Sequence, residues 1–209
     1  MIKKENLIIS FEKNQWREHP DDDVDVYVLD VTNAIIQISK KYGERLYAQS
    51  ILNGYLADEK KIRDYDIKMT DEVFIIGYPS ADKLQHHASN FPFITDGTIS
   101  SQIGQPLEDE HKEKDGSSRK RILRAFLING GILPGSSGSP VILKPTPYRQ
   151  IKNEIVYDNF SPVLLGIASE TRFVFTDRFY GIDYYSLANL GIAFDAVTIK
   201  ETINLFETQ

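Results

Sequence analysis

The apolar positions of this chain fall into short runs separated by turns. Runs rich in β-branched and aromatic residues, bounded by Gly, Pro, Asp or Asn, are typical of β-strands. Such runs occupy residues 7–11, 24–31, 71–79, 124–129 and 141–143. Near the C-terminus apolar residues recur at helical intervals instead: Ala196, Ile199, Ile203 and Phe206. The pattern predicts an all-β protein with one closing helix, and short helical turns around 43–50 and 58–64.

The composition is that of an ordinary globular protein. The 209 residues are 41% apolar and 26% charged, enough for one large or two small domains with a sizeable core. A net charge of −6 without a basic stripe argues against nucleic acid as a partner. No apolar run approaches the roughly 18 residues of a membrane span, and the charged start does not resemble a signal peptide. The chain has no cysteine, which excludes a disulfide or thiol nucleophile and suits a cytoplasmic protein.

Three polar stretches give no metal site. Residues 108–121 are densely charged and predict an exposed hairpin. The five acids between residues 21 and 30 lack the glycine and terminal glutamate of an EF-hand loop. His86 and His87, with Asp82 nearby, are a weak ligand set and are more simply a solvated linker. We therefore predict no metal and no other cofactor.

The most distinctive stretch is Leu-Pro-Gly-Ser-Ser-Gly-Ser-Pro-Val-Ile, from Leu133 to Ile142. Gly135 and Gly138 allow backbone angles closed to other residues, and a proline on each side restricts the chain further. Such a segment can hold a serine at the tip of a rigid turn, with successive N–H groups converging on one point. A serine nucleophile with an oxyanion hole requires that arrangement. The alternative is a surface turn between two strands.

Residues 135–140 resemble the nucleophile loop of trypsin-like (chymotrypsin-fold) serine peptidases, Gly-x-Ser-Gly-Gly/Ser-Pro. The resemblance implies that Ser137 is the nucleophile and that the N–H groups of Gly135 and Ser137 form the oxyanion hole. Asp25 opens Asp-Val-Tyr-Val-Leu, which is similar to the strand opened by the triad aspartate, with Tyr27 replacing a small residue. The alternative for Asp25 is a solvated acid at a strand edge. Ser139 at the fifth position excludes the Gly-x-Ser-x-Gly elbow of α/β-hydrolases.

The resemblance extends to the fold. Gly77-Tyr78-Pro79 is similar to the segment where bacterial members pass from the first barrel to the second. Three later strands resemble the one that opens the second barrel, the one beside the substrate backbone and the last before the closing helix: 96–101, 163–169 and 190–195. The implied fold is a chymotrypsin-like double β-barrel with a C-terminal helix. We expect residues 1–79 to form a partial N-terminal barrel carrying Asp25, and residues 80–209 a C-terminal barrel carrying Ser137.

Five residues would contact substrate by the same resemblance: Gly131, Ser169, Glu170, Thr171 and Gly191. Substrate main chain would add to 163–169 as an extra strand. Glu170 and Thr171 depart from the bulky residue followed by glycine that is common in digestive members. This departure leaves the preferred substrate side chain open.

The histidine of the triad is missing from its expected place. In the family it precedes the aspartate in a segment resembling Thr-(Ala/Asn)-x-His, and no such segment stands among the 24 residues before Asp25. His19 lies six residues before Asp25, and an extended strand would separate the two by about 20 Å, too far for a hydrogen bond unless a turn at Pro20 folds them together. His86 and His87 lie in a polar linker, and His111 lies in the charged hairpin. The simplest interpretation is that the chain is the C-terminal part of a longer peptidase, whose upstream segment with the histidine is encoded earlier, cleaved away or lost. The isolated chain should then be nearly inactive, with about 10³- to 10⁴-fold catalysis over water at most.

Three functions compete at this point. The first is a serine endopeptidase that hydrolyses protein or peptide substrates through an acyl-enzyme on Ser137. The second is a catalytically inactive relative that binds peptides or a partner protein by strand addition along residues 163–171. The third is a β domain in which the Gly-Ser-Ser-Gly-Ser-Pro turn carries no chemistry.

Overall fold

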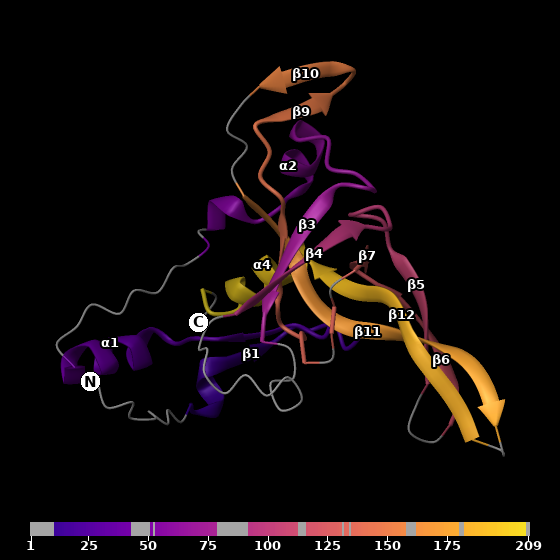
Figure 1. Ribbon diagram of the computed structural model, residues 1–209. Coiled ribbons are helices and arrows are strands. Elements are labelled where there is room, and N and C mark those ends of the chain that lie inside the picture. The colour runs from indigo at the N-terminus through magenta and orange to yellow at the C-terminus, as the bar shows by residue number, and fades with distance from the viewer. Residues whose placement is uncertain are drawn as a thin grey trace, which may run out of the picture.

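A computed structural model describes residues 11–42, 51, 53–78, 92–112, 116–130, 132–133, 135–157, 162–179 and 182–207 (Figure 1). Its strands are β1 (Trp16–Glu18), β2 (Tyr27–Leu29), β3 (Glu72–Gly77), β4 (Phe93–Ile99), β5 (Leu107–Lys112), β6 (Ser118–Leu123), β7 (Ala125–Asn129), β8 (Pro140–Leu143), β9 (Tyr148–Ile151), β10 (Glu154–Tyr157), β11 (Val163–Phe179) and β12 (Ile182–Asp195). Its helices are α1 (Thr32–Tyr42), α2 (Glu59–Asp64) and α4 (Ala196–Asn204), with 3-10 turns η1 (Lys13–Gln15) and η2 (Asn53–Tyr55).

Six antiparallel strands close into a barrel in the order β11-β12-β7-β4-β3-β8, with β8 pairing back onto β11. Apolar side chains of the barrel strands, each no more than 2% exposed, pack together in the main core: Val73, Ile75, Ile99, Phe126, Ile128, Val141 and Leu165. Buried positions alternate with partly exposed ones along β3 and β8, as expected of strands with one face in a core. The predicted mostly-β character and the closing helix α4 are confirmed.

The barrel begins earlier than the boundary predicted at residue 79. Strand β3 pairs with β4 on one side and with β8 on the other, so residues 72–77 belong to the closed barrel. The Gly-Tyr-Pro signal therefore marks the end of a barrel strand rather than the edge of a domain. Between residues 11 and 71, the described residues form the two-stranded sheet β1–β2 and the helical segments, and no second closed barrel is seen among them.

Helix α1 was not predicted. Its apolar residues Ala34, Ile35, Ile38 and Tyr42 do recur at helical intervals, a signal that the sequence-based prediction missed. The start of the helix is bonded to a side chain just outside it: the Thr32 N–H donates to Asp30 Oδ1 (2.9 Å). The turn predicted at 58–64 is present as α2, where Asp58 Oδ1 accepts from the Lys61 N–H (2.7 Å). The turn predicted at 43–50 lies outside the described residues, as does the strand predicted at 7–11 except for Phe11.

A second apolar cluster joins the N-terminal sheet to the barrel and to α4. It consists of Val24, Val26, Leu123, Ala125, Ile192 and Phe194, with Leu107 packed against it from β5. The cluster thus contains the two residues on either side of Asp25 and both ends of the β5–β6 hairpin. Burial of these side chains, rather than strand pairing, fixes where the segment carrying Asp25 meets the barrel.

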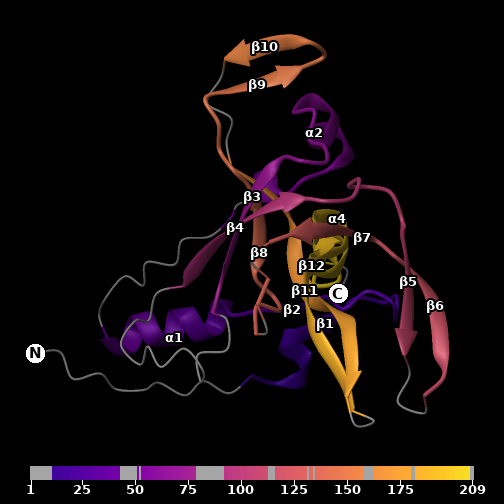
Figure 2. The same cartoon turned by 45° about the vertical axis from the view of Figure 1, so that its right-hand side comes forward.

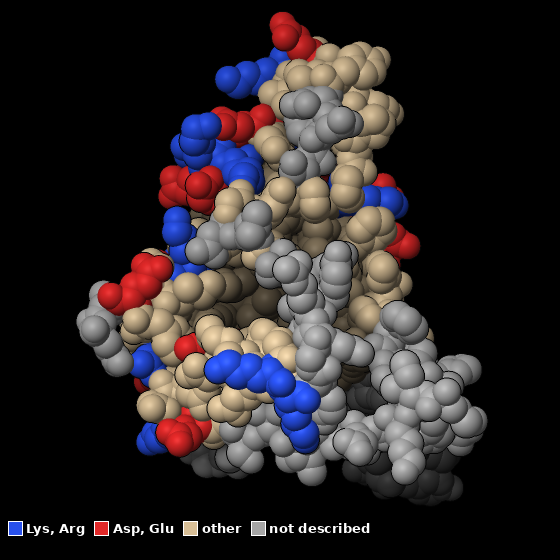
Figure 3. Space-filling view, turned by 90° about the vertical axis from the view of Figure 1, so that its left-hand side faces the viewer, with Lys and Arg blue, Asp and Glu red and all other residues tan. Residues whose placement is uncertain are grey.

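Two hairpins and one long ribbon extend from the barrel (Figures 1 and 2). Hairpins β5–β6 and β9–β10 are separate two-stranded sheets, and β11 and β12 continue past the barrel as a two-stranded ribbon. On the face at the left of Figure 1, uncharged residues surround a hollow, and charged side chains gather towards one margin (Figure 3). Within the described part of the chain, no helix has the length and apolar character needed to span a membrane.

Candidate active site

The predicted nucleophile loop is a tight turn bound to β11. Gly135 and Gly138 have positive φ angles, +89° and +84°, in the region that favours glycine. The Ser139 N–H donates to the Ser136 carbonyl (2.9 Å), which closes the turn around Gly138. The Gly138 N–H donates to the Ala168 carbonyl (2.7 Å), and the Ala168 N–H donates back to the Ser139 carbonyl (2.9 Å). Gly135 and Gly138 therefore lie in a tight loop that backbone hydrogen bonds join to β11 of the barrel.

Two of the three serines in the loop point inward. Ser136 and Ser139 are 4% and 5% exposed, whereas Ser137 between them faces solvent. Ser139 lies against the end of β3: a Cβ atom added to Gly77 would be 1.8 Å from Ser139 Oγ. Gly77 is therefore required by the close approach of the two segments, and the local packing presents the Ser137 side chain alone.

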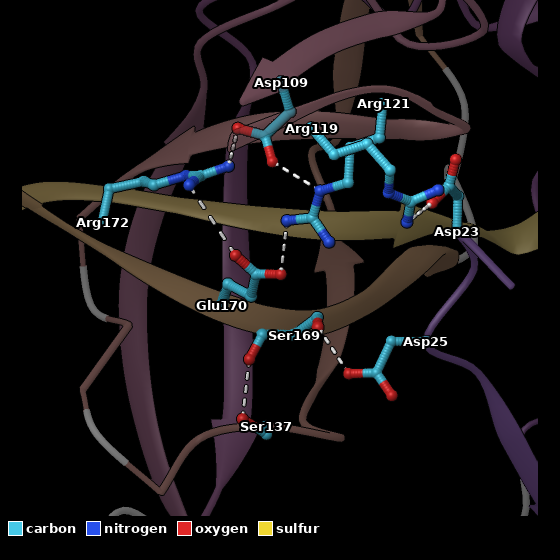
Figure 4. A network of polar contacts seen from close by, with 9 residues as sticks. All are labelled: Asp23, Asp25, Asp109, Arg119, Arg121, Ser137, Ser169, Glu170 and Arg172. Carbon is cyan, nitrogen blue, oxygen red and sulfur yellow. Dashed lines mark hydrogen bonds and ion pairs between the residues drawn. The ribbon is translucent and has the colours of Figure 1, made fainter. Parts of the chain in front are cut away.

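Ser137 and Asp25 are brought to the same place by a third residue, Ser169 on β11. The Ser137 hydroxyl donates to the Ser169 carbonyl oxygen (2.7 Å), and the Ser169 hydroxyl donates to Asp25 Oδ2 (3.0 Å). Figure 4 shows these three residues as one line of polar contacts. The side chains of Ser137 and Asp25 are both exposed. The nucleophile and the acid predicted from sequence are thus joined through a predicted substrate-binding residue.

Asp25 is held at the tip of a narrow turn. Val24 and Val26 on either side of it are 4% and 1% exposed, and the Val26 N–H donates to the Val24 carbonyl (2.9 Å). The two valines anchor the segment in the second apolar cluster, which leaves Asp25 pointing outward towards Ser169. The strand predicted at 24–31 is present only as β2, from Tyr27 to Leu29, because the residues before it form this turn.

The loop also offers backbone donors beside the Ser137 hydroxyl. No hydrogen bond joins the Gly135 N–H or the Ser137 N–H to another described residue. Backbone N–H groups of one turn can bind an oxygen that gains negative charge during acyl transfer, if they point to the same place. The Ser137 hydroxyl itself donates to a carbonyl, which cannot take its proton. The structure thus brings the predicted nucleophile and the predicted acid together, and among the described residues the Ser137 hydroxyl makes no contact with a histidine.

His19 is committed to a different contact. It is 6% exposed, its Nδ1 accepts from the Asp21 N–H (3.1 Å), and its Nε2 is 3.1 Å from Glu201 Oε2. Because Nδ1 accepts, Nε2 carries the proton and donates to the Glu201 carboxylate. Both ring nitrogens are therefore used between the N-terminal segment and α4. His86 and His87 lie outside the described residues, as does the side chain of His111.

Glu201 also accepts two hydrogen bonds from Arg124 (2.6 and 3.2 Å). These bonds, with a smaller contribution from His19, lower the pKa of the Glu201 carboxyl. A carboxyl whose pKa is lowered by folding stabilises the fold above its unfolded pKa, and this stabilisation is lost as pH falls through the folded pKa. The effect belongs to the acid limb of the stability curve, below the usual glutamate pKa of about 4.3.

We expect Glu201→Gln to be less stable than the native chain at neutral pH and equal to it in acid. The difference should be about 1 kcal/mol at most, because the Glu201 side chain is 44% exposed and partly screened. Urea unfolding followed by circular dichroism at pH 7, 5, 4 and 3 measures it. Glu207→Gln, an exposed carboxylate just after the same helix, is the control. A gap between Glu201→Gln and the native chain that stays constant with pH would contradict the assignment.

The other predicted substrate-binding residues lie in different surroundings. Thr171 on β11 lies opposite Gly191 on β12, and a Cβ atom on Gly191 would be 2.3 Å from Ile132 Cδ1. Ile132, which the sequence did not point to, therefore fills the space next to Gly191. Glu170 accepts from Arg121 (2.7 Å), so its carboxylate is already paired. Gly131 lies outside the described residues.

Three of the acids between residues 21 and 30 contact separate partners. Asp23 pairs with Arg119 (2.6 Å), Asp25 accepts from Ser169, and Asp30 bonds the start of α1. In the part of the chain that the structure describes, no three His, Asp or Glu side chains are grouped in a way that could hold a metal ion.

Comparison with known proteins assigns no family to the chain. No protein-family model matches the chain, and a search of curated proteins finds no match. The assignment of a function therefore depends on the loop at 135–140 and on its contacts with Ser169 and Asp25.

Proposed function

We propose that the chain is part of a trypsin-like serine endopeptidase in which Ser137 is the nucleophile and Asp25 is the acid of the triad. The observation that supports it most is the line of hydrogen bonds from Asp25 through Ser169 to Ser137. Asp25 lies 112 positions before Ser137 and 144 positions before Ser169 in the sequence. A surface turn with no catalytic role would not be expected to lie beside this acid. In this proposal the closed barrel is the second barrel of a chymotrypsin-like pair, acting in the cytoplasm.

The proposed reaction is acyl transfer. Ser137 Oγ attacks the scissile carbonyl carbon of a peptide, and its proton passes to a histidine supplied from outside the described residues. The carbonyl oxygen takes the negative charge and accepts from the N–H groups of Gly135 and Ser137. The C–N bond breaks as the amine leaves with that proton, and water then hydrolyses the ester on Ser137. Asp25 orients the histidine and stabilises its charged form.

The exposure of Ser137 and Asp25 supports a base that arrives from elsewhere. The contact of the Ser137 hydroxyl with a carbonyl favours the second candidate, an inactive relative that binds peptides along β11. The two candidates differ in whether Ser137 becomes nucleophilic once a base is provided.

Imidazole in solution can provide that base. We expect a fluorophosphonate probe to label the purified chain slowly in buffer, and about 10-fold faster or more when imidazole is added, because general-base catalysis is typically of this size or larger. In the labelling step the Ser137 oxygen displaces fluoride from phosphorus and imidazole takes the proton. Intact mass measures the rate, and peptide mapping locates the label. The rate should follow the concentration of neutral imidazole as pH changes.

Ser137→Ala is the essential control and should abolish the label, whereas Ser118→Ala, an exposed serine on β6, should leave it unchanged. Labelling that survives in Ser137→Ala, or none at Ser137 at any imidazole concentration, would remove the peptidase proposal. The second outcome, together with measurable binding of extended peptides, would favour the inactive relative.

A further inference from the structure

Four charged side chains close a ring between the β5–β6 hairpin and strand β11 (Figure 4). Asp109 and Arg121 lie directly opposite each other in the hairpin, and Arg121 Nε donates to Asp109 Oδ2 (2.7 Å). Arg121 Nη2 donates to Glu170 Oε1 (2.7 Å), and Arg172 donates to Asp109 Oδ1. Arg172 and Glu170, two residues apart on β11, complete the ring at 3.7 Å. The charges alternate, so every carboxylate faces guanidinium groups.

The hairpin half of this ring is nearly buried, although the sequence predicted an exposed hairpin. The side chains of Arg121 and Asp109 are 9% and 10% exposed, against 31% and 34% for Arg172 and Glu170. Ion pairs shielded from water in this way interact much more strongly than exposed ones. Removing one partner is costly because its neighbours keep an unpaired charge.

The ring adjoins one of the residues of β11 that strand pairing does not fix; Arg172 of the ring lies in a second such irregularity, between Thr171 and Phe173. Ala168 pairs with Ala193 and Glu170 with Ile192, so Ser169 between them is an extra residue in a β-bulge. Pairing with β8 stops at Ile167. A bulged residue is unpaired, and its side chain can be aimed in more than one direction. Ser169 is also the residue whose carbonyl meets Ser137 and whose hydroxyl meets Asp25.

The hairpin contacts the other side of the site as well. Arg119 on β6 pairs with Asp23 (2.6 Å), two residues before Asp25. Leu123 at the end of the hairpin is fully buried in the cluster that contains Val24 and Val26. The hairpin therefore bridges the turn that carries Asp25 and the strand that carries Ser169.

We propose that Asp109 and Arg121 are positioning residues for the active site: through Glu170 and Arg172 they hold the bulge at Ser169 so that it joins Asp25 to Ser137. The catalytic consequence rests on the proposed function, whereas the effect on the bulge does not. Neither Asp109 nor Arg121 contacts the reacting atoms. They act by fixing a bulge that the strand ladder leaves free.

The experiment compares Arg121→Gln with three other variants of the full chain. Lys120→Gln loses the same charge from the adjacent position, whose side chain is exposed and points to the opposite face. Ile103→Val, in the main core, is a control for loss of stability alone. Arg121→Lys keeps a positive charge but cannot hold both carboxylates with one fork. Each variant is measured by hydrogen exchange of the peptide 166–172 and by imidazole-assisted labelling of Ser137, with urea unfolding as the common reference.

We expect Arg121→Gln to speed exchange in 166–172 and to slow labelling by about tenfold or more, since small displacements at a reacting centre have effects of this size or larger. Arg121→Lys should recover part of the rate, and Lys120→Gln should match the native chain. Labelling of Arg121→Gln at the native rate would overturn the proposal. So would a loss of labelling rate in Arg121→Gln that is no greater than the loss in Ile103→Val at an equal unfolding midpoint. If neither the native chain nor any variant is labelled, the peptidase proposal fails, and hydrogen exchange alone tests the positioning role. Unchanged exchange in Arg121→Gln would then overturn that role, and faster exchange confined to residues 166–172 would support it.

Discussion

Gly166→Ala is expected to lower the free energy of unfolding by about 3 kcal/mol or more, the upper range for overpacking a core. A Cβ atom at this position would be 2.0 Å from the carbonyl oxygen of Phe194 and 2.9 Å from its carbonyl carbon. Both atoms belong to the backbone of β12, which cannot rotate away as a side chain could. Relief requires β11 and β12 to separate where Gly166 faces Asp195, and this would open the barrel.

Urea unfolding followed by circular dichroism measures this effect. Gly54→Ala is the matched control, because a Cβ atom there would meet nothing within 4 Å. The control should stay within about 1 kcal/mol of the native chain. An equal unfolding midpoint for Gly166→Ala and Gly54→Ala would show that the approach of β11 to β12 is not as close as described.

Gly77→Ala is expected to have the next largest effect and to act on the nucleophile loop. The added methyl group would overlap Ser139 Oγ, at 1.8 Å, and press on its Cβ at 3.0 Å. Ser139 is buried and its backbone is bonded to Ala168, so its hydroxyl must rotate in a confined space and its Cβ must move by a few tenths of an ångström. We expect a loss of about 1–3 kcal/mol in unfolding free energy, together with slower imidazole-assisted labelling of Ser137.

The double variant Gly77→Ala, Ser139→Gly tests the cause. Removing the Ser139 side chain restores the space that the new methyl group takes, so the double variant should recover most of the lost stability. Ser139→Gly by itself supplies the baseline for this comparison. If the two substitutions are additive, the contact between β3 and the loop is not the origin of the loss.

The charged hairpin is a place where the sequence-based prediction and the structure differ. The dense charge of 108–121 correctly predicted a hairpin, and β5–β6 is one. The prediction that its side chains are exposed was wrong for Asp109 and Arg121. Their oppositely charged partners are far away in the sequence: Glu170 is 49 positions from Arg121, and Arg172 is 63 positions from Asp109. The sequence of the hairpin contains only Asp109 and Arg121 of the ring. Without their partners on β11, these two residues look like the charged residues of a solvent-exposed face.

The same division runs through the candidate site. The sequence alone predicted a tight turn at residues 133–140, because its prolines restrict the backbone and its glycines adopt angles closed to other residues. The local hydrophobic pattern also predicted the strands β3, β7 and β8 and the closing helix, whereas β4, β11 and β12 were predicted by resemblance. The tertiary structure alone decided that Ser169 contacts Asp25, 144 positions away, and that His19 contacts Glu201, 182 positions away. It likewise assigned β3 to the closed barrel. Such contacts form because distant segments bury their apolar neighbours together, and no local pattern records which segments will meet.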